Sequence, residues 1–198
     1  MKETIANHAY DYLERIGNLV RMGARRVPPV NGIQPVQLEA LHYLSSCNRY
    51  SNTPLAVAEY LGLTKGTVSQ TLSVLEANGL IEKIPDGKDR RVVRLVLTPT
   101  GEALLAEAIP PRVLALAMGE LTEQASQEIV AALQGLLQAM QKANQLKSFG
   151  VCGTCRHHRL EADGSRWCGL TLEALQPSDA EKICREHTAP DEALDAPP

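Results

Sequence analysis

The sequence lacks several features that would place the protein in a membrane or mark it as an enzyme. No apolar run approaches the length of about 18 residues that a membrane-spanning helix needs. Residues 1–20 contain acidic residues and lack the apolar core of a signal peptide. No phosphate-binding loop and no nucleophile–base arrangement is recognisable. We therefore expect a cytoplasmic protein that has no membrane partner and is not an enzyme.

The composition predicts one large globular domain with a smaller appendage. The chain has 198 residues, of which 44% are hydrophobic. Its net charge of −3 is unevenly divided, since residues 1–98 are basic overall and residues 99–198 are acidic. A mildly basic first half is compatible with binding to DNA but does not prove it, because the distribution of charge matters more than its sum.

Apolar periodicity and capping residues predict a mainly helical fold with a small β-hairpin. The predicted helices cover about residues 4–24, 35–46, 54–62 and 64–79, and two more begin near residues 98 and 122. Two short strands are expected at about 80–84 and 92–97. The last two helices carry apolar stripes, which we expect to pair with a second subunit; the alternative is packing within the same subunit.

The helix at 64–79 has two contrasting faces. Val68, Leu72 and Leu75 recur at core spacing. Its other face carries short polar side chains, which suit close approach to base edges and phosphates; the alternative is a solvated face. The hairpin that follows has a cationic tip, typical of a wing that contacts phosphate or a minor groove.

Two motifs resemble the MarR family of transcriptional regulators. Residues 63–81 resemble the family's recognition helix, and the Asp-x-x-Asp-Arg-Arg run at 86–91 resembles its wing. Leu-Thr-x-x-Gly follows at 97–101, as in the family. The resemblance covers about residues 4–146. It implies a winged helix-turn-helix at about 34–98 within a DNA-binding and dimerisation domain at 1–147.

The resemblance implies a homodimer, joined by its first and last helices, that binds double-stranded DNA at a palindromic operator. We expect a repressor. Asp89 and Arg91 would support the wing, and Arg90 would reach DNA. A small-molecule effector or a cysteine often controls such proteins, but we expect Cys47 to be a buried apolar side chain. The candidate DNA-binding residues are Thr64, Lys65, Thr67, Ser69, Gln70, Ser73, Lys88, Arg90 and Arg91.

Four cysteines behind this domain have the spacing of a metal site. Cys152, Cys155, Cys168 and Cys184 lie within residues 148–187, which have few apolar side chains. We expect a metal to organise this segment, with Cys168 and Cys184 on separate loops. Residues 188–198 are predicted to be a disordered tail.

One Cys-x2-Cys pair followed by two single cysteines favours an iron–sulfur cluster, most simply [4Fe-4S], over Zn²⁺. The segment resembles high-potential iron–sulfur proteins around Trp167–Leu170 but departs from them at Cys184. Its thin aromatic shielding is typical of a labile redox sensor. His158 and His187 could add nitrogen ligands. The alternatives are a zinc module for protein docking, and a metal-dependent enzyme or electron carrier.

Overall fold

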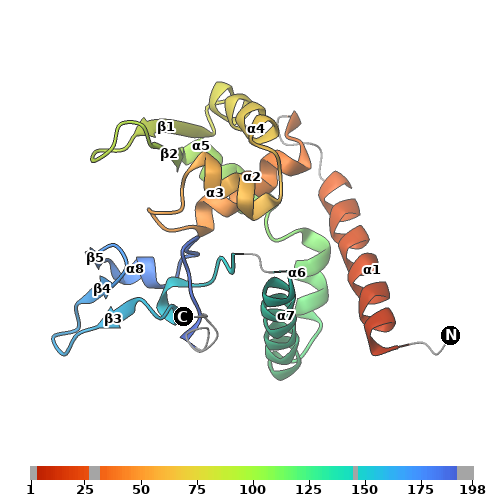
Figure 1. Ribbon diagram of the computed structural model, residues 1–198. Coiled ribbons are helices and arrows are strands. Elements are labelled where there is room, and N and C mark those ends of the chain that lie inside the picture. The colour runs from red at the N-terminus through yellow and green to blue at the C-terminus, as the bar shows by residue number, and fades with distance from the viewer. Residues whose placement is uncertain (1–3, 27–31, 145–146, 191–198) are drawn as a thin grey trace.

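The computed structural model describes residues 4–26, 32–144 and 147–190, which form a winged helix, three helices that extend from it, and a small β unit (Figure 1). The helices are α1 (Ile5–Arg26), α2 (Pro35–Ser46), α3 (Pro54–Leu61), α4 (Lys65–Ala77), α5 (Pro99–Ala108), α6 (Arg112–Gly119), α7 (Glu123–Ala143), the 3-10 helix η2 (Cys152–Thr154) and α8 (Pro177–Ala180). The strands are β1 (Ile81–Pro85), β2 (Val93–Leu97), β3 (His158–Leu160), β4 (Arg166–Cys168) and β5 (Glu173–Leu175).

The helix-turn-helix begins and ends where local signals place it. The Thr53 side chain caps α3 by accepting a hydrogen bond from the backbone of Ala56, and Pro54 occupies the first turn. Gly62 then ends α3 in the left-handed conformation, with φ of 65°. Two residues later, the Thr64 side chain caps α4. The predicted boundaries of both helices are therefore confirmed to within two residues.

The winged-helix core lies between α2, α3, α4, the β1–β2 hairpin and α5. Val68, Leu72 and Leu75 of α4 are buried, as their spacing predicts. Cys47 is also buried and belongs to this core. β1 and β2 pair in antiparallel register, with Ile81 opposite Leu97. The first turn of α5 packs so closely on the hairpin that a Cβ at Gly101 would overlap the carbonyl oxygen of Leu80.

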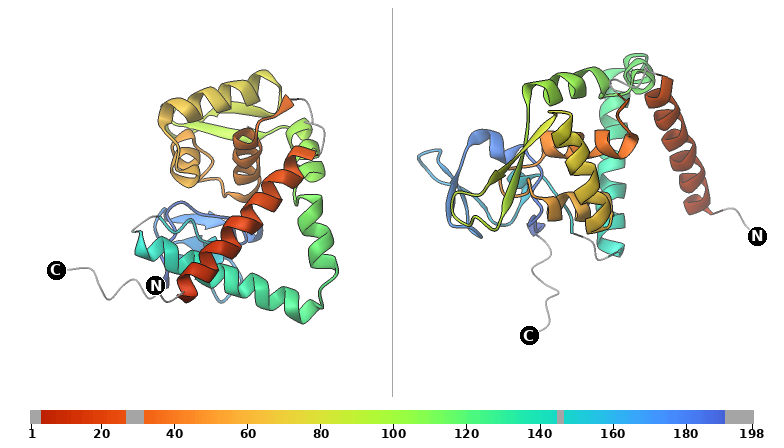
Figure 2. Two further views of the ribbon diagram at one scale, coloured as in Figure 1. Left: turned by 90° about the vertical axis from the view of Figure 1, so that its right-hand side faces the viewer. Right: turned by 90° about the horizontal axis from the view of Figure 1, so that it is seen from above.

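Three amphipathic helices extend away from the wing (Figures 1 and 2). α1 packs on α6, whereas neither α6 nor α7 buries a residue within the described chain. The chain turns between α5 and α6 at the Ile109–Pro110 bond. No helix in the described ranges is long and apolar enough to cross a membrane. Large apolar side chains exposed on these helices include Ile5, Tyr12, Ile16, Leu19, Leu116, Val130, Leu133, Leu137 and Met140.

The cysteine-bearing segment contains a three-stranded antiparallel sheet with the order β3–β4–β5. This corrects the expectation that Cys168 lies on a loop, because it is the last residue of β4. Thr188 accepts a hydrogen bond from the backbone of Arg156, so ordered structure continues into the start of the predicted tail. The rest of that tail, from residue 191 onwards, lies outside the described residues.

Candidate DNA-contacting face and cysteine cavity

The polar face of α4 is fully available to a partner. The six candidate residues on this helix and its cap are all exposed: Thr64, Lys65, Thr67, Ser69, Gln70 and Ser73. The Thr64 and Thr67 hydroxyls lie 2.9 Å apart, which fixes the geometry of the first turn. Because the opposite face is anchored in the core, α4 presents these side chains on a rigid element.

The wing tip carries the three predicted cations in three different settings. Arg91 donates from Nε and Nη2 to the Asp89 carboxylate, at 3.0 Å in each case, so the aspartate and arginine expected to support the wing are brought together. Arg90 is exposed beside them. Lys88 differs, because its ammonium forms an ion pair with Glu173 of the β unit.

A third ion pair at the wing, which sequence reasoning missed, fixes the base of the hairpin tip. Arg94 Nε donates to Asp86 Oδ2 at 2.7 Å, and its Nη1 donates to the backbone carbonyls of Arg49 and Tyr50. Arg94 and the backbone amides of Lys88 and Asp89 hold the pKa of Asp86 at about 2. The wing is thereby tied to the loop between α2 and α3. The signal in the sequence is an acid at the tip and a cation on the outgoing strand.

The four cysteines of the module line one small cavity of about 30 Å³. Cys152 and Cys155 come from η2 and the residue after it, Cys168 from β4, and Cys184 from the segment beyond α8. Burial, together with the neighbouring thiols, raises the pKa of Cys152 to about 12. Burial also raises the pKa of Cys184, which the Asn48 and Ser51 side chains oppose. The fold thus brings together thiols that lie up to 32 positions apart in the sequence.

The side chains at the cavity are of the kind that binds metals, but they lie farther apart than the ligands of one bound metal ion would. Within the ranges 4–26, 32–144 and 147–190, no three His, Cys, Asp or Glu side chains are grouped closely enough to hold a metal ion. Within the described residues, the buried His158 Nε2 at the cavity has no hydrogen-bond partner, and the Asn48 side chain faces the Cys184 thiol. The backbone amide of Thr188 lies 3.4 Å from Cys155 Sγ. Such N–H groups are the donors that metal-bound thiolates accept from.

The two candidate histidines differ in position. His158 lines the cysteine cavity, and so does His157. His187 lies outside it, and both of its ring nitrogens face hydroxyls: Nδ1 lies 2.7 Å from Ser148 Oγ and Nε2 lies 3.0 Å from Thr154 Oγ1. We therefore retain His158 as a candidate extra ligand and not His187.

The module is docked on the loop between α2 and α3. Two backbone hydrogen bonds join the module to this part of the winged helix. Asn48 N donates to Ile183 O and Ile183 N donates to Ser46 O, both at 2.8 Å. Arg185 forms a two-pronged ion pair with Glu59 of α3, at 2.6 and 2.8 Å. Asn48 itself reaches the cysteine cavity. The cavity is therefore built partly from the winged helix.

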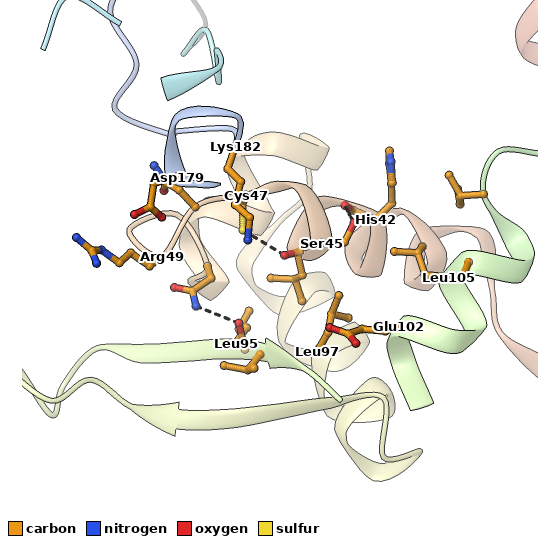
Figure 3. A pocket seen from close by; sticks show the side chains of 16 residues that line it. His42, Ser45, Cys47, Arg49, Leu95, Leu97, Glu102, Leu105, Asp179 and Lys182 are labelled. Carbon is orange, nitrogen blue, oxygen red and sulfur yellow. Dashed lines mark hydrogen bonds between the residues drawn. The ribbon is translucent and has the colours of Figure 1, made fainter. Parts of the chain in front are cut away.

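A larger cavity of about 590 Å³ is lined by residues of α2, β2, α5 and the module (Figure 3). Leu95, Leu97 and Leu105 supply apolar surface, while Glu102 and Lys182 supply charged groups. Cys47 borders it as well, and burial raises the pKa of this thiol to about 12, in agreement with the prediction of a buried apolar side chain. The cavity combines apolar walls with a few charged groups, which is common in small-molecule sites.

The described fold and sequence match known transcription regulators. A family model described as "MarR family" matches residues 31–92. The transcriptional repressor NicR of Pseudomonas putida is 31% identical over 122 residues, which make up 58% of this chain and 77% of that protein. The chain belongs to the MarR family. The regulator YsmB of Bacillus subtilis is 29% identical over 100 residues, which make up 50% of this chain and 67% of that protein. These relatives place the protein among transcriptional regulators and not among enzymes.

Solved structures of the MarR family agree with the winged-helix fold. A complex of S. aureus MepR with DNA is 26% identical, has a TM-score of 0.51, and matches 67% of this chain and 98% of its own. Streptococcus pneumoniae FabT in complex with DNA has a TM-score of 0.55 at 23% identity, matches 70% of this chain and 99% of its own, and is similar in fold alone. Nearly the whole of each of these two solved chains is therefore matched, whereas about a third of this chain is not.

Proposed function

We propose that the protein is a homodimeric repressor that binds a palindromic operator in double-stranded DNA. The observation that carries this proposal is the exposed polar face of α4 beside the cationic wing tip. The MarR-family structures with bound DNA support it. The exposed apolar side chains of α1, α6 and α7 support a dimer, since they would be covered by a second copy.

Operator binding can be tested through its dependence on salt. Changing Arg90 to Ala should weaken binding to every DNA sequence and lower the slope of log K against log[salt] by about one unit, because one phosphate contact is lost. Lys142→Ala on α7 is the matched control, and we expect it to keep the full slope. An unchanged slope in the Arg90 variant would remove this residue from the DNA interface.

We further propose that a metal centre held by Cys152, Cys155, Cys168 and Cys184 controls DNA binding. An iron–sulfur cluster is favoured, and Zn²⁺ is the alternative. The convergence of the four thiols on one cavity supports the proposal, as do the backbone amide of Thr188 beside Cys155 and the Asn48 side chain beside Cys184. A cluster would supply sensitivity to oxidants, nitric oxide or iron supply, whereas zinc would hold the loops together.

Purification under anaerobic conditions, followed by metal analysis and an absorption spectrum, distinguishes these centres. Visible absorption with iron and sulfide in equal amounts supports the cluster. A colourless protein with one tightly bound zinc per chain would refute the sensing proposal and leave a structural metal. Cys152→Ala should lose the bound metal in either case, since this thiol is the most buried of the four.

A zinc-organised docking module is the second candidate function. Four large apolar side chains are exposed on the β unit and would suit a protein partner: Leu160, Trp167, Leu170 and Leu172. Under this reading, Cys152→Ala would abolish partner binding and leave operator binding unchanged. A small-molecule effector in the larger cavity remains compatible with either candidate.

A further inference from the structure

Glu173, the first residue of β5, extends from the cysteine module to the DNA-binding lobe. Its Oε2 accepts a hydrogen bond from Tyr50 Oη at 2.8 Å, and its Oε1 is paired with the ammonium of Lys88. Arg49 Nη2 lies 3.9 Å from the same carboxylate and also donates to the carbonyl of Ala174. Lys88 and Tyr50 together hold the pKa of Glu173 below its ordinary value, so the carboxylate is charged at neutral pH.

The position of Glu173 depends on the strand that carries a candidate metal ligand. In the β4–β5 ladder, Cys168 pairs directly with Glu173. Two residues further along β5, Leu175 is buried and lines the cysteine cavity. Tyr50, which holds the Glu173 carboxylate, lines the same cavity. A rearrangement of the thiols would therefore move the strand that places Glu173, the tyrosine that binds it, or both.

The contacts of Glu173 reach the two parts that fix the wing. Lys88 lies in the turn at the wing tip, and Tyr50 lies in the α2–α3 loop. Arg94 ties these parts together by binding Asp86 of the tip and the Tyr50 carbonyl. The module lies on the α2–α3 side of the wing, away from α4 (Figures 1 and 2). It can therefore hold the wing without covering the recognition face.

We propose that Glu173 is the positioning residue through which the cysteine cavity acts on the wing, by holding Lys88 and Tyr50 in place. This inference rests on the proposed control of DNA binding by a metal in that cavity. It assigns Lys88 a role in holding the wing to the module in addition to any contact with phosphate. The test does not require knowing whether metal strengthens or weakens DNA binding. In either case, removing Glu173 should reduce the difference in operator affinity and in wing exchange between metal-loaded and metal-free protein.

The test compares Glu173→Gln with Glu161→Gln, an exposed glutamate in the turn between β3 and β4 of the same module. Each full-length protein is stripped with a chelator, and separate samples are loaded with Zn²⁺ or reconstituted anaerobically with ferrous iron and sulfide. Operator affinity and hydrogen exchange at the wing amides, residues 86–92, are measured for every sample. Exchange is recorded without DNA, so it reports the wing itself.

In Glu173→Gln, we expect the ratio of operator affinities between loaded and stripped protein to move toward one by about threefold, which lies within the range for losing an exposed ion pair with its hydrogen bond. The difference in wing exchange between loaded and stripped protein should vanish. Glu161→Gln should behave as the unaltered protein. A Glu173→Gln protein that retains the full metal-dependent difference in wing exchange would overturn the inference.

The two proposals fail in different ways. If loading the unaltered protein changes operator affinity by less than about twofold, metal control of DNA binding is refuted. The role of Glu173 is then decided by exchange alone, because its loss must still abolish any metal-dependent difference at the wing. If affinity does respond to metal but equally so in Glu173→Gln, metal control stands and Glu173 does not transmit it.

Discussion

Phe149 joins the cysteine module to the winged-helix core, and its removal is the most direct test of that union. The side chain is 9% exposed. Its ring meets Tyr43 edge-on at 6.0 Å between centroids and Tyr60 at 5.3 Å. The backbone of Phe149 has φ of 44°, in the left-handed region that side chains other than glycine rarely adopt. Such a conformation persists where the surrounding contacts offset its cost.

The magnitude follows from what Phe149→Ala removes. Burial of the ring contributes about 1.5–3 kcal/mol, and each edge-on pair adds about 0.5–1.5 kcal/mol. The unfavourable backbone conformation remains in the variant, so none of its cost is recovered. We expect the free energy of unfolding to fall by about 3–5 kcal/mol, as for other buried phenylalanines changed to alanine. Phe149→Leu keeps most of the apolar volume and should lose about 1–2 kcal/mol.

Urea unfolding of the chelator-treated protein measures this loss. Hydrogen exchange should locate it, because the amide of Cys184 donates to Gly150 O and the amide of Asn48 donates to Ile183 O. Both amides should exchange faster in Phe149→Ala, since they lie at the junction of the two parts. A loss below about 1 kcal/mol with unchanged exchange would refute the conclusion that this residue joins them.

Two further predictions concern the wing and the helix that follows it. Gly101→Ala should lower the melting temperature in a thermal scan, because the new Cβ would overlap the Leu80 carbonyl oxygen; a melting temperature equal to that of the unaltered protein would contradict the close packing of α5. Asp86 stabilises the wing while it is ionised. Arg94 holds its pKa at about 2, compared with an ordinary value of 3.8, so this contribution is complete above about pH 4 and is lost as the pH falls through 2. The protection of the wing amides, taken relative to their intrinsic exchange rate at each pH, should therefore fall over that range in the unaltered protein and show no such step in Asp86→Asn.

The winged helix could be predicted from sequence because its signals are local. Thr53, Gly62 and Thr64 lie at the helix ends that they specify. The buried positions of α4 repeat at helical spacing, so their burial follows from the pattern alone. The sequence indicates a role for Gly101 only through the Leu-Thr-x-x-Gly motif and gives no physical reason for glycine there. The structure supplies its physical reason, which is the approach of α5 to the backbone of Leu80.

The module could be predicted only in part, because its contacts are distant in sequence and its strands are short. β3, β4 and β5 have three residues each, too few to display an alternating pattern. The cysteine spacing predicted that the thiols converge, and they do line one cavity. Nothing local indicates that Arg185 pairs with Glu59 or that Glu173 pairs with Lys88, since 126 and 85 positions separate these partners.

The docking site of the module determines which part of the DNA-binding lobe it can influence. The α2–α3 loop carries Asn48 at the cysteine cavity, Tyr50 at Glu173, and the carbonyls that accept from Arg94. The wing and the module therefore share one short stretch of backbone. A change at the thiols could reach the wing tip through this loop without requiring α1, α6 or α7 to move. Control by this route would alter the wing of each subunit of the proposed dimer separately and leave the contacts between the subunits as they are.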